Sequence, residues 1–319
     1  MAASLKPGWS RPSTILFASE IPANENALRF AMAQAREFGA NLNLFHANDR
    51  LVVAASEASG LRFHNDAAAA RVEAGQLEPY ADMARAEGIR CEIIVRPGPP
   101  AEQIASLLKE RQGDRIVMGT HSPGSVGKLL VGSVAEALVR TAKVPVFVVG
   151  PGVPDSRYRN YATRTILCAL SMNEASETVA ALAAEIAAQH NARLILQHVI
   201  KPQERAEVLR RSSIDELEGD LLVLVPKNLR NRLRVQTIVV PGDPTEELLY
   251  QARAQQADLI VLGAQRASAF AAVTRQGVVY KALAHAHCPV ITLSPAVLAE
   301  CGVRVMHDHR AEVFLAGVF

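Results

Sequence analysis

The residues of this chain best suited to hold an anion lie between Gly119 and Val134. Gly119 follows an apolar run that ends at Met118, and Gly132 and Ser133 open a second run with helical spacing. The first turn of a helix leaves backbone N–H groups unpaired and carries about half a positive charge. This order of strand, glycine-bearing loop and helix start therefore predicts a phosphate-binding loop.

Further side chains that fit the same ligand follow the first two apolar strands. Ser19 and Glu20 come directly after a strand that ends at Ala18, and Ala47 ends the next strand. Ligands of doubly wound sheets bind beyond the carboxyl ends of the strands, so these residues should converge on the loop. We expect Glu20 to accept hydrogen bonds from ribose hydroxyls or an adenine amine, and Ser133 to contact phosphate. The alternative is that Glu20 is a solvated loop acid.

The histidines predict binding more than catalysis. His121 lies in the loop and is the histidine that we expect to contact a phosphate. A general base also needs a positioned nucleophile and an orienting partner, and the sequence shows neither, so we expect no catalytic residue. We expect no metal site either, because helical positions two apart point to different sides. The metal candidates considered are His285, His287, Cys288, His307 and His309.

Motifs of other nucleotide and hydrolase chemistries do not fit. Gly127 and Lys128 resemble the end of a P-loop, but Leu129 stands where a serine or threonine would hold magnesium. The chain contains neither the GxGxxG fingerprint of dinucleotide sites nor a GxSxG nucleophile elbow.

Apolar runs of strand length alternate with helical patterns, which predicts an α/β fold with doubly wound parallel sheets. A helix is expected from Asn24, which can cap it, to Gly39, which stops it. The frame from 118 to 149 recurs 144 positions later, with Gly263 on Gly119 and Pro289 on Pro145. The chain is therefore predicted to be a duplication.

The repeat divides the chain into a first domain over 1–150, a linker over 151–162, a second domain over 163–295 and a tail over 296–319. Ser171 follows the first strand of the second half, so the acid is missing there. Gln276 and Gly277 stand in the places of Gly132 and Ser133, and Arg266 stands in the place of Ser122. We expect that this half does not bind ATP by the mode of its nucleotide-binding counterpart, and that its role is structural or regulatory. The tail is expected to cover an edge as a strand or helix, or to be disordered.

Composition limits the class of partner. The net charge is +2, without a run of basic residues interleaved with aromatics, so no nucleic-acid binding is expected. The four cysteines form no CxxC pair, which favours a reduced compartment. With no signal-like apolar stretch at the start and no run of membrane-spanning length, we expect a cytoplasmic protein without membrane partners.

At the loop the chain resembles the universal stress protein family. Nucleotide-binding members carry glycine, two residues, glycine, nine residues, glycine, then serine or threonine. This chain has Gly119, Ser122, Gly132 and Ser133 at those places, so three of the four marks match, and Ser122 replaces the second glycine. The family's acid after the first strand is usually aspartate, and Glu20 occupies its position.

The resemblance spans about residues 12–295 and implies two tandem five-stranded sheets of the adenine nucleotide alpha hydrolase-like, Rossmann-like type, in strand order 3-2-1-4-5. It implies that the last strand of each half pairs across a pseudo-two-fold axis, giving an intramolecular pseudo-dimer, and leaves open a homodimer of tandem chains. ATP, with or without magnesium, is the implied ligand. The expected contact residues are Ala18, Ser19, Glu20, Ala47, Met118, Gly119, Thr120, His121, Ser122, Gly132, Ser133 and Val134.

The sequence therefore predicts a nucleotide-responsive stress protein that holds ATP in its first half and is not an enzyme. Two alternatives stay open: a scaffold that has lost nucleotide binding in both halves and acts through protein partners, and a slow ATPase.

Overall fold

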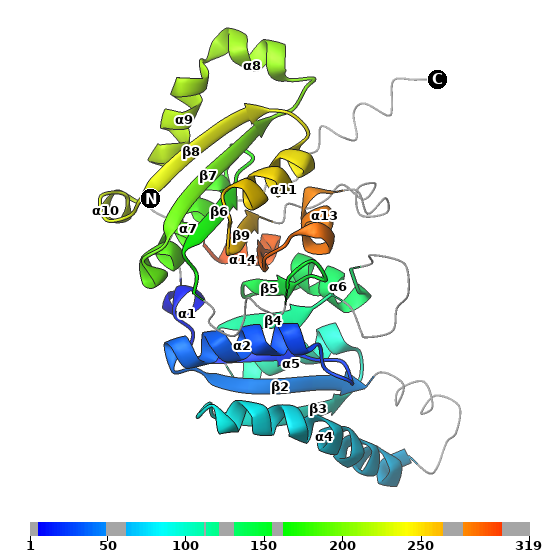
Figure 1. The fold of residues 1–319 in the computed structure, drawn as a ribbon. Coiled ribbons are helices and arrows are strands. Elements are labelled where there is room, and N and C mark those ends of the chain that lie inside the picture. Colours follow the sequence, from blue (N-terminus) through cyan, green and yellow to red (C-terminus); the bar gives the residue numbers. More distant parts are fainter. Residues whose placement is uncertain are drawn as a thin grey trace, which may run out of the picture.

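A computed structural model of the chain describes residues 6–48, 62–111, 113–120, 131–154, 162–263 and 277–301. These residues form one continuous ten-stranded sheet with helices on both faces (Figure 1). The strands are β1 (Thr14–Ala18), β2 (Asn41–Asn48), β3 (Cys91–Pro97), β4 (Arg115–Gly119), β5 (Val146–Val149), β6 (Thr165–Ala169), β7 (Arg193–Ile200), β8 (Val235–Pro241), β9 (Leu259–Gly263) and β10 (Val290–Leu293). The helices are α1 (Pro7–Ser10), α2 (Glu25–Phe38), α4 (Arg62–Ala86), α5 (Pro100–Arg111), α6 (Ser133–Thr141), α7 (Ser176–His190), α8 (Arg205–Arg211), α9 (Ile214–Val223), α10 (Lys227–Arg230), α11 (Pro244–Ala254), α13 (Val278–His285) and α14 (Pro295–Glu300).

The strand order is β3-β2-β1-β4-β5-β10-β9-β6-β7-β8. Each half is parallel and has the expected order 3-2-1-4-5, read from its outer edge to the centre of the sheet. The only antiparallel pair between described strands is β5 with β10, where Phe147 pairs with Ile291. These two residues are equivalent in the repeat, so the pseudo-two-fold axis passes between them. The expected pairing of the two final strands is confirmed.

Two hydrophobic layers hold the helices on the sheet, and each layer runs through both halves. One contains Phe17, Phe30 and Phe147 together with Leu182 and Leu196, beneath α2 and α7. The opposite face buries side chains of α5, α6, α11 and α13. Because neither layer is interrupted at the seam between β5 and β10, the two halves share their core.

A buried arginine joins the N-terminal segment to this seam. Arg115 is 1% exposed, and its guanidinium lies 4.5 Å from the ring centroid of Phe147. It donates to Gln34 Oε1 at 2.5 Å and to the carbonyl oxygens of Trp9 and Ser10 at 2.9 and 3.1 Å. These hydrogen bonds fix α1, and Ser10 Oγ in turn donates to Glu185 of α7 in the second half at 3.1 Å.

Several helix boundaries follow from local chemistry that the sequence shows. Asn24 Oδ1 accepts the N–H of Ala27, and Gly39 ends α2 in the left-handed conformation, with φ of 64°. Asp243 caps α11, which begins at Pro244. Helix α7 begins at Ser176, directly after a turn over residues 174–175.

The structure also places segments that the sequence left unassigned. Between β7 and β8 the chain forms α8, α9 and α10, and α9 begins with a capping box made by Ser213 and Glu216. The predicted start of the tail falls inside α14, whose Val297 and Leu298 are buried. The rest of the tail and most of the predicted linker lie outside the described residues. Among the described helices, none combines the length and hydrophobicity that crossing a membrane requires.

Both halves keep one hydrogen bond that fixes the loop after their first strand. His46 Nδ1 lies 2.9 Å from the carbonyl oxygen of Ser19, and His198 Nδ1 lies 2.9 Å from that of Leu170. A carbonyl oxygen only accepts, so Nδ1 must donate in both rings. The two histidines are thus structural, and they occupy matched places near the ends of equivalent strands.

This geometry fixes the tautomer of both rings. Long-range ¹H–¹⁵N NMR spectra of the neutral rings should show the proton on Nδ1 of His46 and His198, because each Nδ1 faces a carbonyl oxygen. Replacing His198 with phenylalanine should remove one of the two signals and leave that of His46 unchanged. A proton found on Nε2 alone in either neutral ring would contradict the hydrogen bond.

Phe147 is expected to be a main support of the seam, since its ring packs on Arg115 and on Phe30, 6.0 Å away between centroids. Phe147→Ala should lower the free energy of unfolding by ~3–5 kcal/mol, the usual cost of removing a buried aromatic ring. Urea denaturation measures the change. Val72→Ala is the control, because Val72 is 63% exposed and should shift stability by no more than ~0.5 kcal/mol. A loss below ~1 kcal/mol for Phe147→Ala would show that the seam does not depend on this ring.

Candidate functional site

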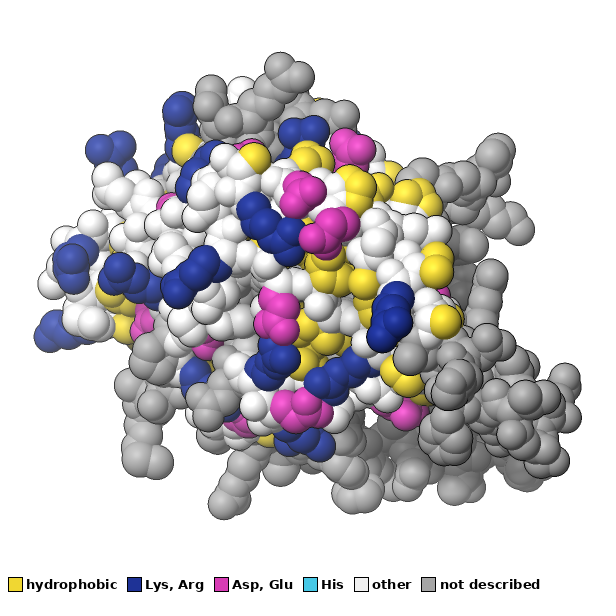
Figure 2. Space-filling model, turned by 90° about the horizontal axis from the view of Figure 1, so that it is seen from below, with side chains coloured by type: hydrophobic (Ala, Val, Ile, Leu, Met, Phe, Trp, Pro, Cys, Tyr) yellow, Lys and Arg dark blue, Asp and Glu magenta, His cyan; other side chains and the backbone are white. Residues whose placement is uncertain are grey.

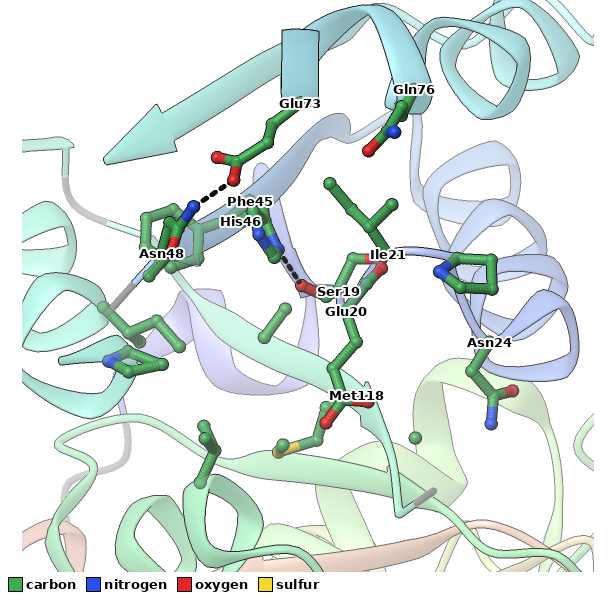
Figure 3. Close-up of a pocket in the computed structure, with 17 residues that line it drawn as sticks. Ser19, Glu20, Ile21, Asn24, Phe45, His46, Asn48, Glu73, Gln76 and Met118 are labelled. Atoms are coloured by element: carbon green, nitrogen blue, oxygen red, sulfur yellow. Dashed lines mark hydrogen bonds between the residues drawn. The ribbon is translucent and has the colours of Figure 1, made fainter. Parts of the chain in front are cut away.

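A cavity of about 540 Å³ lies at the carboxyl ends of β1, β2 and β4 in the first half (Figure 3). It brings together residues that are far apart in the sequence but were expected to share one ligand. Seven of the twelve expected contact residues line it: Ala18, Ser19, Glu20, Ala47, Met118, Gly119 and Val134.

The loop after β1 places the carboxylate residue Glu20 at the cavity. The N–H of Ser19 donates to the carbonyl of Phe45 at 2.8 Å, and its carbonyl accepts from His46. Ser19 Oγ donates to the carbonyl of Glu20 at 2.6 Å. With the loop held in this way, the exposed Glu20 side chain extends across the cavity toward Met118 (Figure 3).

Gly119 is required by a close approach at the end of β4. A Cβ at this position would lie 2.6 Å from Asn24 Nδ2 and 2.9 Å from Asn24 Cβ. Asn24 cannot simply move, because its side chain caps α2. The glycine therefore lets the strand end, the helix cap and the cavity wall meet at one point.

The start of α6 offers backbone groups beside the cavity. Gly132 is the N-cap residue, with φ of −62° and ψ of 154°, and no side chain caps the helix. A Cβ on Gly132 would meet only the carbonyl oxygen of Thr120, at 3.7 Å. Thr120 itself is buried, and it does not line the cavity, nor do Gly132 and Ser133. His121 and Ser122 lie outside the described residues.

The structure adds polar residues that the sequence did not single out. Asn48 at the end of β2 donates to Glu73 of α4, and Gln76 lies one helical turn further on the same wall (Figure 3). Glu73 Oε2 is shielded from solvent and has no hydrogen-bond partner within the described parts of the chain. Asn48 follows Ala47 directly and could have been found by extending the strand by one residue. The spacing of Glu73 and Gln76 shows that they share a helix face, but not that the face meets this cavity.

The second half has its own cavity, of about 420 Å³, at the carboxyl ends of β6, β7 and β9. Ser171 lines it in the position of Glu20. Helix α13 begins one residue later than the offset of 144 predicts, so Gly277 is its N-cap and takes the role of Gly132, not that of Ser133 as expected. The helix ends stay in register, since Ala142 and Ala286 are the two C-caps. Arg266 and Gln276 lie outside the described residues.

Cys91 and Cys168 are poor nucleophiles. Burial raises the pKa of the Cys91 thiol to about 11 and raises that of Cys168 further. Thiols of such high pKa stay protonated near neutral pH. Within the described parts of the chain, no group of three or more His, Cys, Asp and Glu side chains is placed to hold a metal ion. His307 and His309, two of the metal candidates, lie outside those parts.

The edge of the sheet around β3 carries paired charges of both signs. Arg96 and Arg111 bind Glu110 and Glu92 at 2.6 and 2.5 Å, and Arg85 binds Glu78 at 2.9 Å. The hydrogen bond from Arg96 lowers the pKa of Glu110 to about 2. On the face seen from this end of the molecule, basic and acidic side chains alternate (Figure 2).

The model of the universal stress protein family matches residues 13–150 and 162–294. A universal stress protein of Thermus aquaticus is 31% identical over 125 residues, which is 39% of this chain and 88% of the relative. One from Methanocaldococcus jannaschii is 35% identical over 79 residues, which is 24% of this chain and 46% of the relative, about half its length.

The crystal structure of a universal stress protein from Archaeoglobus fulgidus has the same fold over 88% of this chain and 98% of its own, with a TM-score of 0.64 and 17% identity. A putative universal stress protein from Pseudomonas aeruginosa covers 91% of this chain and 96% of its own, with a TM-score of 0.60 and 16% identity. The likeness of fold thus extends over both halves. Since the family model also matches both, the chain belongs to the universal stress protein family.

Proposed function

We propose that this protein binds an adenine nucleotide, with ATP as the main ligand, in the cavity of its first half and acts as a nucleotide-responsive stress protein. The observation that carries the proposal is the convergence of seven expected contact residues on one cavity of about 540 Å³. This volume lies within the range of ~300–1,000 Å³ that is usual for small-molecule sites.

The two ends of the cavity suit the two ends of a nucleotide. Phe45, Ile104 and Met118 give apolar walls for a flat base, and the carboxylate of Glu20 can accept from ribose hydroxyls. Gly132, the N-cap residue of α6, has no side chain to cap the helix, so it leaves the first N–H groups and the helix dipole to phosphates, with or without magnesium.

We propose a binding role and not an enzymatic one. No described residue of the cavity is a nucleophile with a general base aimed at it. Nucleotide that binds only the folded state would stabilise this half by about 2.7 kcal/mol at a concentration 100 times Kd. A change in nucleotide concentration would then shift the balance between the nucleotide-free and nucleotide-bound populations of the protein.

In the second half we propose that the family mode of ATP binding has been lost. Ser171 replaces the acid, and Ile200 replaces Asn48 at the end of the second strand. The helix start is retained at Gly277, so the loss concerns the ribose side of the cavity.

The test is calorimetric titration of magnesium ATP into the full chain and into Gly132→Asp. An aspartate at the N-cap should occupy the free N–H groups and repel the phosphates, so affinity should fall at least tenfold. The fold should be kept or slightly stabilised, because the new Cβ has room and aspartate is a favourable N-cap.

Gly277→Asp is the matched control. It places the same residue at the equivalent cap of α13, where a Cβ meets no atom within 4 Å. Its affinity for ATP should equal that of the unchanged protein. No heat at millimolar ATP would contradict nucleotide binding, and a loss confined to Gly277→Asp would place the site in the second half. Phosphate release above background would favour the slow ATPase.

A further inference from the structure

The cavities of the two halves differ at one buried strand position that lines both of them. Phe45 of β2 is buried and lines the first cavity, whereas Gln197 of β7 takes its place in the second. Both precede the matched histidines, His46 and His198. The repeat has therefore exchanged an aromatic ring for a carboxamide while keeping the surrounding scaffold.

The Gln197 carboxamide is deeply buried and unpaired. The residue is 1% exposed, and neither Nε2 nor Oε1 has a hydrogen-bond partner among the described residues. Its neighbours in the sheet are Ala169 and Ile238, and Leu248 of α11 lines the same cavity. Buried amide groups without partners destabilise a fold, so such a residue calls for an explanation.

Another buried glutamine of this chain, Gln34, does have a hydrogen-bond partner. Gln34 is also 1% exposed, but its Oε1 accepts from Arg115 at 2.5 Å. The contrast indicates that Gln197 is kept for a partner that comes from outside the chain.

Two other polar residues of the second cavity already have partners. Asn173 Oδ1 accepts the N–H of Ala175, and Lys201 forms an ion pair with Glu204 at 3.1 Å. Apolar side chains make up much of the lining: Leu170, Val199, Leu248, Leu262, Val278 and Val279. Among the described lining residues, Lys201 is the sole lysine or arginine, and its ammonium is paired with Glu204, so these residues offer no unpaired lysine or arginine to a phosphate or carboxylate.

We propose that the second cavity binds a small uncharged molecule that carries an amide edge, with Gln197 as its recognition residue. Oε1 accepts the N–H of the ligand and Nε2 donates to its carbonyl oxygen. A flip of the carboxamide only exchanges the two atoms, so one donor and one acceptor stay side by side. The site is separate from the nucleotide site proposed in the first half.

Three ring compounds of similar shape test, in the full-length protein, whether the second cavity selects an amide group. Nicotinamide carries the amide, 3-acetylpyridine keeps the carbonyl but has no N–H, and nicotinate carries a charge. We expect methyl NMR signals of Val199 and Leu248 to shift with nicotinamide, at least tenfold weaker binding of 3-acetylpyridine, and no shifts with nicotinate.

Gln197→Leu separates recognition from folding. It should abolish the preference for nicotinamide and raise the melting temperature, because two unpaired polar groups leave the core. Gln34→Leu is the matched control: it should lower the melting temperature, since Arg115 loses a partner, and should leave nicotinamide binding unchanged.

Three results would overturn the proposal. Equal binding of the three probes, or no shifts up to the solubility limit of nicotinamide, would show that the carboxamide does not select an amide. A lower melting temperature of Gln197→Leu would show that resident water already satisfies the side chain. Each outcome is independent of ATP binding, which Gly132→Asp tests.

Discussion

The antiparallel pairing of β5 with β10 is the constraint on which the rest of the structure depends. Each half alone would end in a strand with an unpaired edge, and such edges invite association. Pairing the two final strands inside one chain closes both edges and makes a single sheet with a shared core. The ring of Phe147 and the guanidinium of Arg115 lie at this seam, so the N-terminal segment is fixed by the same contacts.

Within this shared sheet, the two halves have kept the contacts that hold their loops and helix starts, but they differ in the side chains that line their cavities. The bonds from His46 and His198 to the preceding loops are equal in length, and both helix starts have a glycine at the N-cap. The residues that line the two cavities have diverged instead, with Glu20 opposite Ser171 and Phe45 opposite Gln197. A duplicated fold can thus carry two different sites, because the groups that hold a loop are not the groups that contact a ligand.

Much of the fold could be predicted from the sequence because its signals are local. Asn24, Gly39 and the pair Asp243-Pro244 mark helix ends by their own side-chain or backbone chemistry, and the repeat shows which strands are equivalent. The strand order came from the family resemblance. Helices α8 to α10 escaped prediction because their charged sequence has no clear apolar period.

The site was predictable only in part, for a physical reason. Residues that follow a strand must lie at its carboxyl end, so Ser19, Glu20 and Ala47 could be placed together. Glu73 reaches the same cavity from a helix face, and nothing in sequence spacing says what a face packs against. The unpaired carboxamide of Gln197 is likewise a property of packing, since a polar residue in an apolar strand is usually paired.

A hydrogen bond between the two halves lies beside the start of α6. The N–H of Val131, next to the start of α6, donates to the hydroxyl of Tyr280 in α13, at 3.1 Å. The second half thus supplies an acceptor to the backbone beside the start of α6 in the first half. If the two halves were separated, the N–H of Val131 would have to hydrogen-bond to water instead of Tyr280. The two copies therefore depend on each other and are not interchangeable modules.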